Sequence, residues 1–272
     1  MDRRSRFSLP VFVLLLITFS VATLRAQVFS SEQVQVAPPG GNSAAPSPSA
    51  SVQQLELNGD LMRARKLYLD AMDYYQAALA KSPNNARIYN KTGIVELELQ
   101  RYREAGRDFT HAIKAQHNFA DAYNNLGVID YLMKKNGRAV KQYKKAIQIN
   151  GNSASFYSNL ATAYFSQKEF VAATEAYAKA MQIDPDIFDH ASRNGVSGRI
   201  SSPQDRAHYD YVLAALFAKM GNVDRSLAYL KRAMEEGYKK VEDAYKDPEF
   251  ATMRNDARFT ELMASKPTAI PE

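Results

Sequence analysis

The stretch that decides the fold is ASFYSNLATAYFSQKEFVAATEAYAKAMQIDPDI, residues 154–187. Its apolar and small residues recur at the spacing of an amphipathic helix in two successive segments: Tyr157, Leu160, Ala161 and Tyr164 in the first, and Phe170, Ala173, Tyr177 and Ala180 in the second. Asp184-Pro185 ends the second helix, because the residue before a proline disfavours helical geometry. A helix pair this short cannot bury its own apolar face, so it needs copies of itself on both sides.

Two copies precede this stretch at a period of 34 residues: ARIYNKTGIVELELQRYREAGRDFTHAIKAQHNF at 86–119 and ADAYNNLGVIDYLMKKNGRAVKQYKKAIQINGNS at 120–153. Five columns of residue type recur in phase: Tyr89, Tyr123 and Tyr157; Gly93, Gly127 and Ala161; Ala105, Ala139 and Ala173; Phe109, Tyr143 and Tyr177; Ala112, Ala146 and Ala180. The small residues let the two helices of a pair cross closely, and the large residues fill the space towards the next pair. A further copy at 52–85 fits less well, because Asn58 stands in an apolar column, as expected for a terminal repeat whose outer face meets water.

This pattern resembles the tetratricopeptide repeat family, whose unit carries an aromatic residue, Leu-Gly, Tyr, Ala, an aromatic residue, Ala and Pro at these offsets. The early Trp of the family is Tyr here, and the closing Pro is present at Pro83 and Pro185 but replaced by His117 and Gly151 between them. The resemblance implies an all-α fold: a right-handed α-solenoid of about five helix-turn-helix repeats with short capping helices at the C-terminal end. The four regular repeats span 52–85, 86–119, 120–153 and 154–187.

The period breaks after Ile187. Residues 188–206 separate the fourth repeat from a fifth helix pair at 207–237, and this insertion is either a loop with its own function or a tolerated insertion without one. Residues 238–272 resemble the end-of-group segment that closes many bacterial tetratricopeptide proteins. That resemblance implies a cap over the last apolar edge, with an apolar face made of Phe250, Met253, Phe259 and Met263.

The N-terminal part has a different organisation. Residues 1–26 begin with Arg3, Arg4 and Arg6, continue through an apolar segment and reach Leu24-Arg25-Ala26, which predicts a secretory signal peptide and an exported, periplasmic or secreted protein. The alternative is an uncleaved anchor in the inner membrane, because residues 7–24 approach the minimum length of a spanning helix. Residues 27–51 are rich in Pro, Gly, Ser and Ala and predict a disordered linker.

The sequence gives no basis for an enzyme. The absence of cysteine excludes disulfides, thiolate metal sites and thiol catalysis. Of the four histidines, His111 and His117 lie six residues apart, which does not place them on one helical face for metal binding. There is no phosphate-binding loop, nucleophile elbow or HExxH motif. We therefore expect no catalytic, cofactor-binding or metal-binding residues.

The charge pattern contains one basic feature. Half of the formal net charge of +6 lies in residues 1–26, so the basic balance gives little support to nucleic-acid binding. In the rest of the chain the densest basic run consists of Lys134, Lys135, Arg138, Lys141, Lys144 and Lys145. Its spacing places it on the turn and outward face of the third repeat's second helix, where it is either a solvated face or a contact for an acidic partner or anionic lipid.

In this family the first helices of successive repeats line a concave groove at fixed positions of the unit. Carried over to this sequence, these positions imply a partner-binding groove made of Asn90, Ile94, Leu97, Asn124, Asn125, Val128, Tyr131, Ser158, Asn159, Thr162 and Phe165. Asn125 and Asn159 suit an extended peptide, because an amide side chain can donate to and accept from a peptide backbone at once. Asparagines in such a groove also bond neighbouring helices, and that alternative stays open.

The function that the resemblance implies is an exported, non-catalytic scaffold for protein–protein interaction, with a peptide or partner protein bound in the groove. The alternative is a structural or assembly subunit of a bacterial cell-envelope complex that docks through its edges or its basic convex face. The charged clamp by which some members hold chaperone C-termini does not match, because residues such as Glu56, Asp60 and Ile94 occupy or adjoin its positions. We expect protein or peptide partners, no cofactor, no nucleic acid, and membrane contact only if the N-terminal segment stays uncleaved.

Overall fold

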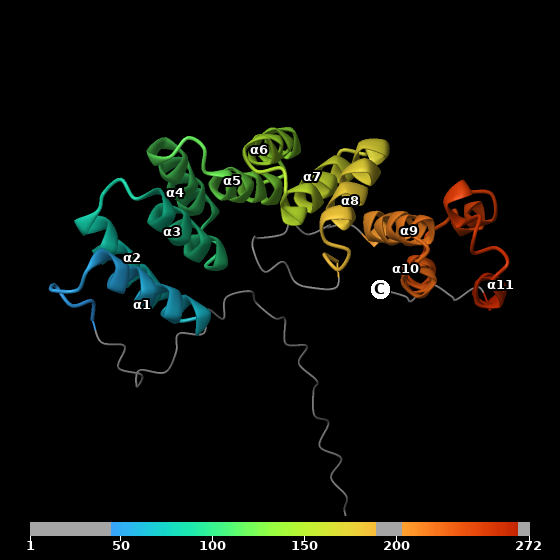
Figure 1. The fold of residues 1–272 in the computed structure, drawn as a ribbon, viewed down its shortest axis with the longest axis horizontal. Coiled ribbons are helices and arrows are strands. Elements are labelled where there is room, and N and C mark those ends of the chain that lie inside the picture. Colours follow the sequence, from blue (N-terminus) through green and yellow to red (C-terminus); the bar gives the residue numbers. More distant parts are fainter. Residues whose placement is uncertain (1–44, 189–202, 266–272) are drawn as a thin grey trace, which may run out of the picture. The chain divides into compact units, whose positions relative to one another are not determined.

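A computed structural model of the 272-residue chain describes residues 45–188 and 203–265 (Figure 1). The predicted signal peptide at 1–26, most of the predicted linker and residues 189–202 of the insertion lie outside the described residues, as do residues 266–272. All regular structure within the described ranges is helical: α1 (Val52–Ala64), α2 (Tyr68–Lys81), α3 (Ala86–Glu98), α4 (Tyr102–Ala115), α5 (Ala120–Leu132), α6 (Asn136–Ile149), α7 (Ala154–Ser166), α8 (Phe170–Ile183), α9 (Pro203–Lys219), α10 (Val223–Glu235), the 3₁₀-helices η1 (Val241–Tyr245) and η2 (Pro248–Phe250), and α11 (Ala257–Ser265).

Consecutive helices pack in pairs, and the first four pairs, α1–α2 to α7–α8, stack one on another (Figure 1). The first helices of these four pairs begin at Val52, Ala86, Ala120 and Ala154, one period apart. The start of α1 is fixed by a reciprocal cap, in which the Ser51 hydroxyl accepts from the Gln54 amide at 3.2 Å and the Gln54 side chain accepts from the Ser51 amide at 2.8 Å. The expected all-α stack of helix-turn-helix repeats is therefore confirmed.

Within each pair, a large ring of the second helix lies on a small residue of the first. The buried rings of Tyr75, Phe109 and Tyr143 lie against Gly59, Gly93 and Gly127, respectively. A methyl group added at any of these glycines would come within 2.4–2.7 Å of the facing ring. These contacts set the closeness of the helix crossing, which the recurring small and aromatic columns predict.

Between pairs, the second helix of one repeat packs on the first helix of the next. Gly106 of α4 leaves room for Ile129 and Leu126 of α5, and a methyl group added at Gly106 would lie 3.6 Å from Ile129 Cγ2. A single connected core runs from Leu97 in the second repeat to Met263 near the C-terminal end. The repeats thus bury one another's apolar faces, as a short hairpin requires.

The turn inside each pair contains one residue in the left-handed region, at the same place in every repeat. In the four regular repeats these residues are Lys66 (φ 61°), Gln100 (φ 59°), Lys134 (φ 59°) and Lys168 (φ 64°). In the fifth pair the residue is Gly221, with φ 75°. A non-glycine residue adopts this geometry at a cost of about 1–2 kcal/mol, so only the fifth pair makes its turn without this strain.

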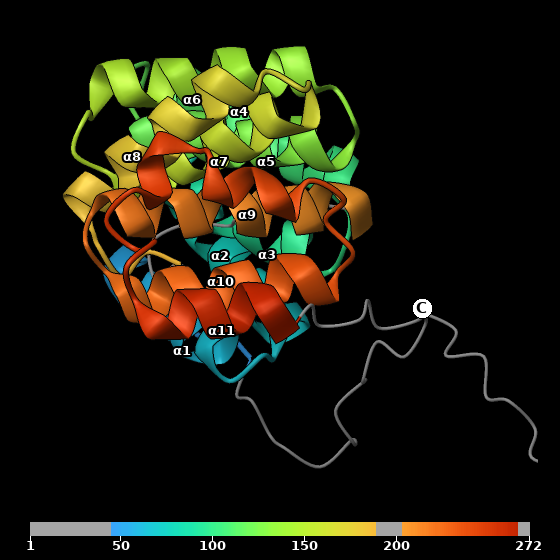
Figure 2. The ribbon, with the colours of Figure 1, turned by 90° about the vertical axis from the view of Figure 1, so that its right-hand side faces the viewer.

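The fifth pair and the cap complete the fold. α9 begins at Pro203, four residues before the sequence-based start at residue 207, and α10 ends at Glu235. The Ser226 hydroxyl of α10 donates to the Ala214 carbonyl of α9 at 2.7 Å, which ties the pair together at its crossing. α11 lies beside α10 (Figure 2), and the four residues expected to form the apolar face of the cap are all buried. Among the described helices, none has the length and apolar character needed to cross a membrane.

The turn geometry gives a prediction about Gly221. Gly221→Ala is expected to lower the free energy of unfolding by about 1–2 kcal/mol, because alanine is strained at positive φ, although no atom lies within 4 Å of the added methyl group. Gly106→Ala is the matched control: it is helical and its added methyl group makes an ordinary contact, so it should raise the same quantity by about 0.5–1 kcal/mol. Chemical denaturation measures both free energies of unfolding. A change in the same direction in both variants would contradict the assignment of backbone strain to the Gly221 turn.

Candidate protein-interaction surfaces

The eleven sequence-predicted groove residues lie on α3, α5 and α7. Nine of them are buried, from Phe165 without exposed surface to Tyr131 with 8% exposed, while Ile94 and Ser158 are partly exposed. These residues lie on three neighbouring first helices, and the surface that they define is here called the first-helix face. Their burial means that most of them are contacted by the protein itself, and only Ile94 and Ser158 combine that location with partial exposure.

The four asparagines of the first-helix face are bonded to one another. Asn159 Nδ2 donates to Asn124 Oδ1 at 2.9 Å, and Asn125 Nδ2 donates to Asn90 Oδ1 at 3.0 Å. Asn124 Nδ2 donates to Asn125 Oδ1 at 3.2 Å and joins the two bonds into one chain across α3, α5 and α7. We call this chain the amide ladder. Both bonds between helices connect residues 35 apart, one more than the repeat length.

Similar polar contacts extend this seam in both directions. Towards the N-terminal end, Lys91 of α3 pairs with Glu56 of α1 at 2.6 Å and with Asp60 at 2.5 Å. Beside α7, the Tyr131 hydroxyl lies 3.1 Å from the Ser166 hydroxyl. Because buried polar groups are costly unless they are hydrogen-bonded, these contacts fix the register between successive first helices.

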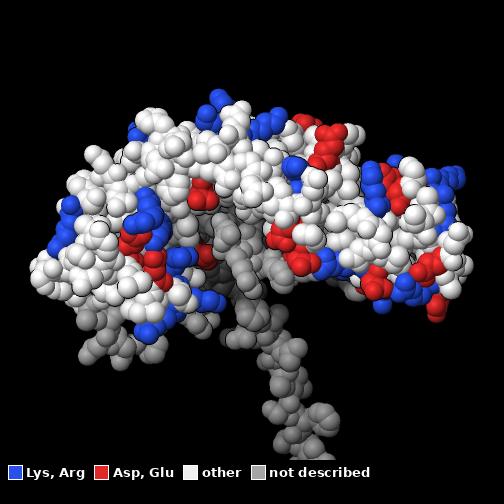
Figure 3. Space-filling view, viewed as in Figure 1, with Lys and Arg blue, Asp and Glu red and all other residues white. Residues whose placement is uncertain are grey.

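The basic run forms a cluster on the outer surface, over α6 (Figure 3). Arg138 Nε lies 3.3 Å from Oδ1 of the buried Asp130, so the charge of Arg138 is compensated by this carboxylate. Lys144 lies over the ring of Tyr164, with its amine 5.4 Å from the ring centre. Within the described ranges, no carboxylate is in ion-pair contact with Lys141, Lys144 or Lys145.

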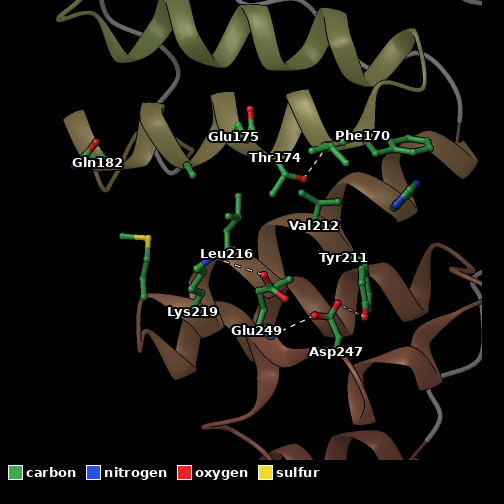
Figure 4. Close-up of a pocket in the computed structure, with 15 residues that line it drawn as sticks. Phe170, Thr174, Glu175, Gln182, Tyr211, Val212, Leu216, Lys219, Asp247 and Glu249 are labelled. Atoms are coloured by element: carbon green, nitrogen blue, oxygen red, sulfur yellow. Dashed lines mark hydrogen bonds and ion pairs between the residues drawn. The ribbon is translucent and has the colours of Figure 1, made fainter.

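A hollow that the sequence analysis did not predict lies between α8 and α9 (Figure 4). We call it the α8–α9 groove. Its volume is about 690 Å³, and its lining is mainly apolar: Val171, Thr174 and Ala178 from α8 and Val212, Leu216 and Met220 from α9. Val171 is 77% exposed and Met220 is 50% exposed, although both are apolar. The groove is thus an open apolar surface on the described part of the chain.

The groove exists because the fifth pair does not stack as the others do. α9 touches α8 at far fewer places than α5 touches α4 or α7 touches α6. The fifth pair aligns with the regular repeats when Ala214 and Ser226 are placed in their two columns of small residues. In that alignment Tyr211, Val212 and Ala215 fall at the positions that were predicted to line the groove in earlier repeats. These three residues line the α8–α9 groove. Extending the family positions past the insertion would have identified this wall of the groove from the sequence.

One end of the groove is polar. The Tyr211 hydroxyl donates to Asp247 at 3.1 Å, and the Lys219 amine lies 3.7 Å from the Glu249 carboxylate (Figure 4). The pKa of Glu249 is raised, mainly by a hydrogen bond with the neighbouring Asp247 carboxyl and to a smaller extent by partial burial. Two carboxyl groups therefore lie close together at this end of the groove.

Below the groove, Asp210 of α9 is buried against α10. Its side chain is 1% exposed and lies 3.2 Å from the guanidinium of Arg232. Burial raises the pKa of Asp210 to about 7, because the half-exposed Arg232 offsets only part of the cost of removing the carboxylate from water. A buried carboxyl group with a raised pKa therefore lies between α9 and α10.

The described residues contain no group of three or more His, Cys, Asp or Glu side chains arranged to hold a metal ion. His208, one of the four histidines, packs between aromatic rings, with its ring centre 4.3 Å from that of Phe170 and 5.3 Å from that of Tyr238. Burial, together with the nearby Lys168, lowers the pKa of His208. The ring packing and burial give His208 a role in the junction between the fourth and fifth pairs.

The helix pairs, their common turn and the contacts between first helices define a protein built from stacked helical-hairpin repeats. Family models described as tetratricopeptide repeat match residues 58–117 and 154–187, and one described as TPR repeat matches residues 129–168. The chain is therefore a tetratricopeptide repeat protein. A search of curated proteins found no match.

A solved structure shows the same fold, and others are similar over much of the chain. The structure titled functional characterization of Pseudomonas aeruginosa pilF is similar over 79% of this chain and 82% of its own, with 19% identity and a TM-score of 0.51. A crystal structure of MamA covers 68% of this chain and 96% of its own at 23% identity, with a TM-score of 0.47. A crystal structure of YrrB, titled a TPR protein with an unusual peptide-binding site, covers 75% and 100% at 17% identity, with a TM-score of 0.48. At 19% identity, the likeness to the pilF structure concerns the fold alone.

The amide ladder gives a prediction about stability. Asn90→Ala and Asn125→Ala are each expected to lower the free energy of unfolding by about 1–3 kcal/mol, because each leaves a buried amide without its partner. The double variant should cost less than the sum of the two, by about 0.5–1.5 kcal/mol. Ser158→Ala, at a partly exposed position of the same face, should change stability by less than about 0.5 kcal/mol. Additive effects in denaturation would show that the two amides are not coupled.

Asp210 gives a prediction about pH. Its pKa is higher in the folded protein than its ordinary value of 3.8, so between about pH 4 and pH 7 the folded state binds more protons than the unfolded state. Its contribution to stability is therefore fully present below about pH 4 and is lost as the pH rises to about 7. Asp210→Asn should flatten this part of the curve of melting temperature against pH, whereas Asp73→Asn, at an exposed position, should leave it unchanged. An unaltered slope in Asp210→Asn would contradict the assignment.

Proposed function

We propose that this chain is an exported, non-catalytic scaffold that binds a peptide or a partner protein along its first-helix face. The observation that carries the proposal is the amide ladder, which holds three successive first helices in one register. A face with fixed spacing between helices offers a binding partner repeated, preorganised positions, which lowers the cost of ordering on binding. The membership in the tetratricopeptide family supports the same general role.

The ligand that fits such a face best is an extended segment. Packed helices lie about 8–10 Å apart, and an extended chain advances about 3.3 Å per residue, so roughly three residues of peptide would cross each first helix. Ile94 and Ser158 provide an apolar and a polar contact from α3 and α7. The asparagines would then act mainly by fixing the helices, because their amides bond one another.

Export is proposed from the sequence of residues 1–26, with a periplasmic or secreted destination after cleavage. The support is the order of a basic start, an apolar segment and a plausible cleavage site. An uncleaved N-terminal anchor in the inner membrane is the alternative location. In both cases the repeats would meet their partner outside the cytoplasm.

A second candidate function is that of an assembly subunit in a cell-envelope complex. The observation in its favour is the cluster over α6, where Lys141, Lys144 and Lys145 make no ion pair with a described carboxylate. Uncompensated positive charge on an exposed helix attracts an acidic protein surface and speeds its association. In this function the partner would contact the outer surface and not the first-helix face.

Site-specific photo-cross-linking in intact cells distinguishes the two functions. A photoreactive residue replaces Ile94 or Ser158 in one set of variants and Lys141 or Lys144 in a matched set on the outer face. We expect a partner adduct from positions 94 and 158, and its loss when Ile94→Glu is combined with the probe at 158, because a buried charge opposes docking of an apolar group. Adducts from positions 141 and 144 alone would reject the first-helix face and support the assembly function. Asn125 and Phe165 are unsuitable positions, because both are buried.

A further inference from the structure

The first helix of the stack carries an exposed apolar stripe. On α1, Leu57 is 67% exposed and Leu61 is 43% exposed. Leu61 stands one period before Val95 and two before Ile129, and both of these are buried. Ile129 is covered by α4 of the preceding repeat. α1 therefore presents the first-helix half of a repeat junction, and no described helix precedes it to cover that half.

The α8–α9 groove presents the other half. In an interior junction, Gly106 of α4 is covered by Leu126 and Ile129 of the following first helix. Its counterpart two periods later is Thr174 of α8, which lines the open groove together with the exposed Val171. α9 covers only part of the surface of α8 that a regularly stacked first helix would cover.

We propose that the α8–α9 groove of one copy receives α1 of a second copy of this chain. The fit follows from the repeat itself, because α1 and α8 are homologous to first and second helices that pack on each other at every interior junction. Their lengths also match: 13 residues in α1 and 14 in α8 each span about 20 Å at 1.5 Å per residue. Leu57 and Leu61 would bury their side chains among Val171, Val212 and Met220.

The charges at the two surfaces are complementary. The exposed residues Arg65 and Lys66 follow the apolar stripe at the C-terminal end of α1. Asp247 and Glu249 lie at one end of the groove, and Glu175 lies on its α8 side (Figure 4). Only Lys219 opposes these three carboxyl groups within the groove lining. Opposite charges at the ends of an apolar contact favour one orientation of the docked helix and speed association.

The proposed contact is heterologous, because one copy contributes α1 and the other contributes the groove. Each docked pair therefore retains one unoccupied groove and one uncovered α1. Association of this kind continues into a ring or an open chain and does not stop at a symmetric dimer. This property separates the proposal from association through two identical surfaces.

The absence of cysteine allows a direct test with the full chain. Two copies with different tags are produced in the same cells, one with Leu57→Cys and the other with Val171→Cys, and both sites are exposed enough to tolerate the change. Oxidation should give a disulfide-linked species that contains both tags, because a disulfide requires Cα atoms within about 7 Å. Adding Met220→Glu to the groove copy, or Leu61→Glu to the α1 copy, should lower its yield by about tenfold or more, the effect of losing roughly 1.4 kcal/mol of binding free energy.

The matched control is Leu69→Cys in place of Leu57→Cys. Leu69 is a 51% exposed leucine in the same repeat, but it lies on α2, at the place that Val171 occupies on α8. It should give no mixed disulfide with Val171→Cys. Three outcomes would overturn the proposal: no mixed species at all, an equal yield from Leu69→Cys, or cross-linking of Leu57→Cys only with itself, which would indicate a symmetric contact between two α1 helices. Circular dichroism and melting of each variant establish that the fold is retained.

Discussion

The close contact between a ring and a glycine is the interaction on which the rest of the stack depends. Tyr143 lies so near Gly127 that even one methyl group would overlap the ring, so the two helices of a repeat are held in one crossing geometry. That geometry leaves an apolar surface on each side of the pair, and only another pair of the same shape covers it. The repeat length, the continuous core and the exposed ends of the stack all follow from this single constraint.

Stacking brings polar side chains of successive first helices together, and the amide ladder is the result. Asn125 and Asn159 lie one period apart, but each bonds the preceding helix through a residue 35 positions earlier. A buried amide is tolerated only when it is hydrogen-bonded, and here neighbouring repeats supply the partner. The ladder therefore converts a loose succession of apolar contacts into a fixed register, which is the condition for recognising an extended ligand over several repeats.

Most of the fold could be predicted from the sequence because it depends on local period and residue size. Gly127 with Tyr143, or Ala161 with Tyr177, identifies a helix crossing without any knowledge of distant contacts. The candidate site was harder to predict from the sequence. Helical spacing places Asn125 on a face of its helix but does not say whether its amide contacts a ligand or Asn90. The α8–α9 groove was missed because residues 188–206 interrupt the period, and the family positions identify its α9 wall only when they are extended past that insertion.

The end of the amide ladder and the start of the groove have a common cause. The two positions that hold Asn124 and Asn125 in the third repeat hold Ser158 and Asn159 in the fourth, and Tyr211 and Val212 in the fifth pair. Tyrosine and valine cannot continue a chain of amide hydrogen bonds from α7. α9 contacts the preceding repeat instead through aromatic packing, with Phe165 5.2 Å from His208 and 6.2 Å from Tyr209 between ring centres. Residues that would form the seam in a regular repeat become the apolar wall of a groove, so a change of side-chain chemistry at two positions separates one interaction surface of this protein from the other.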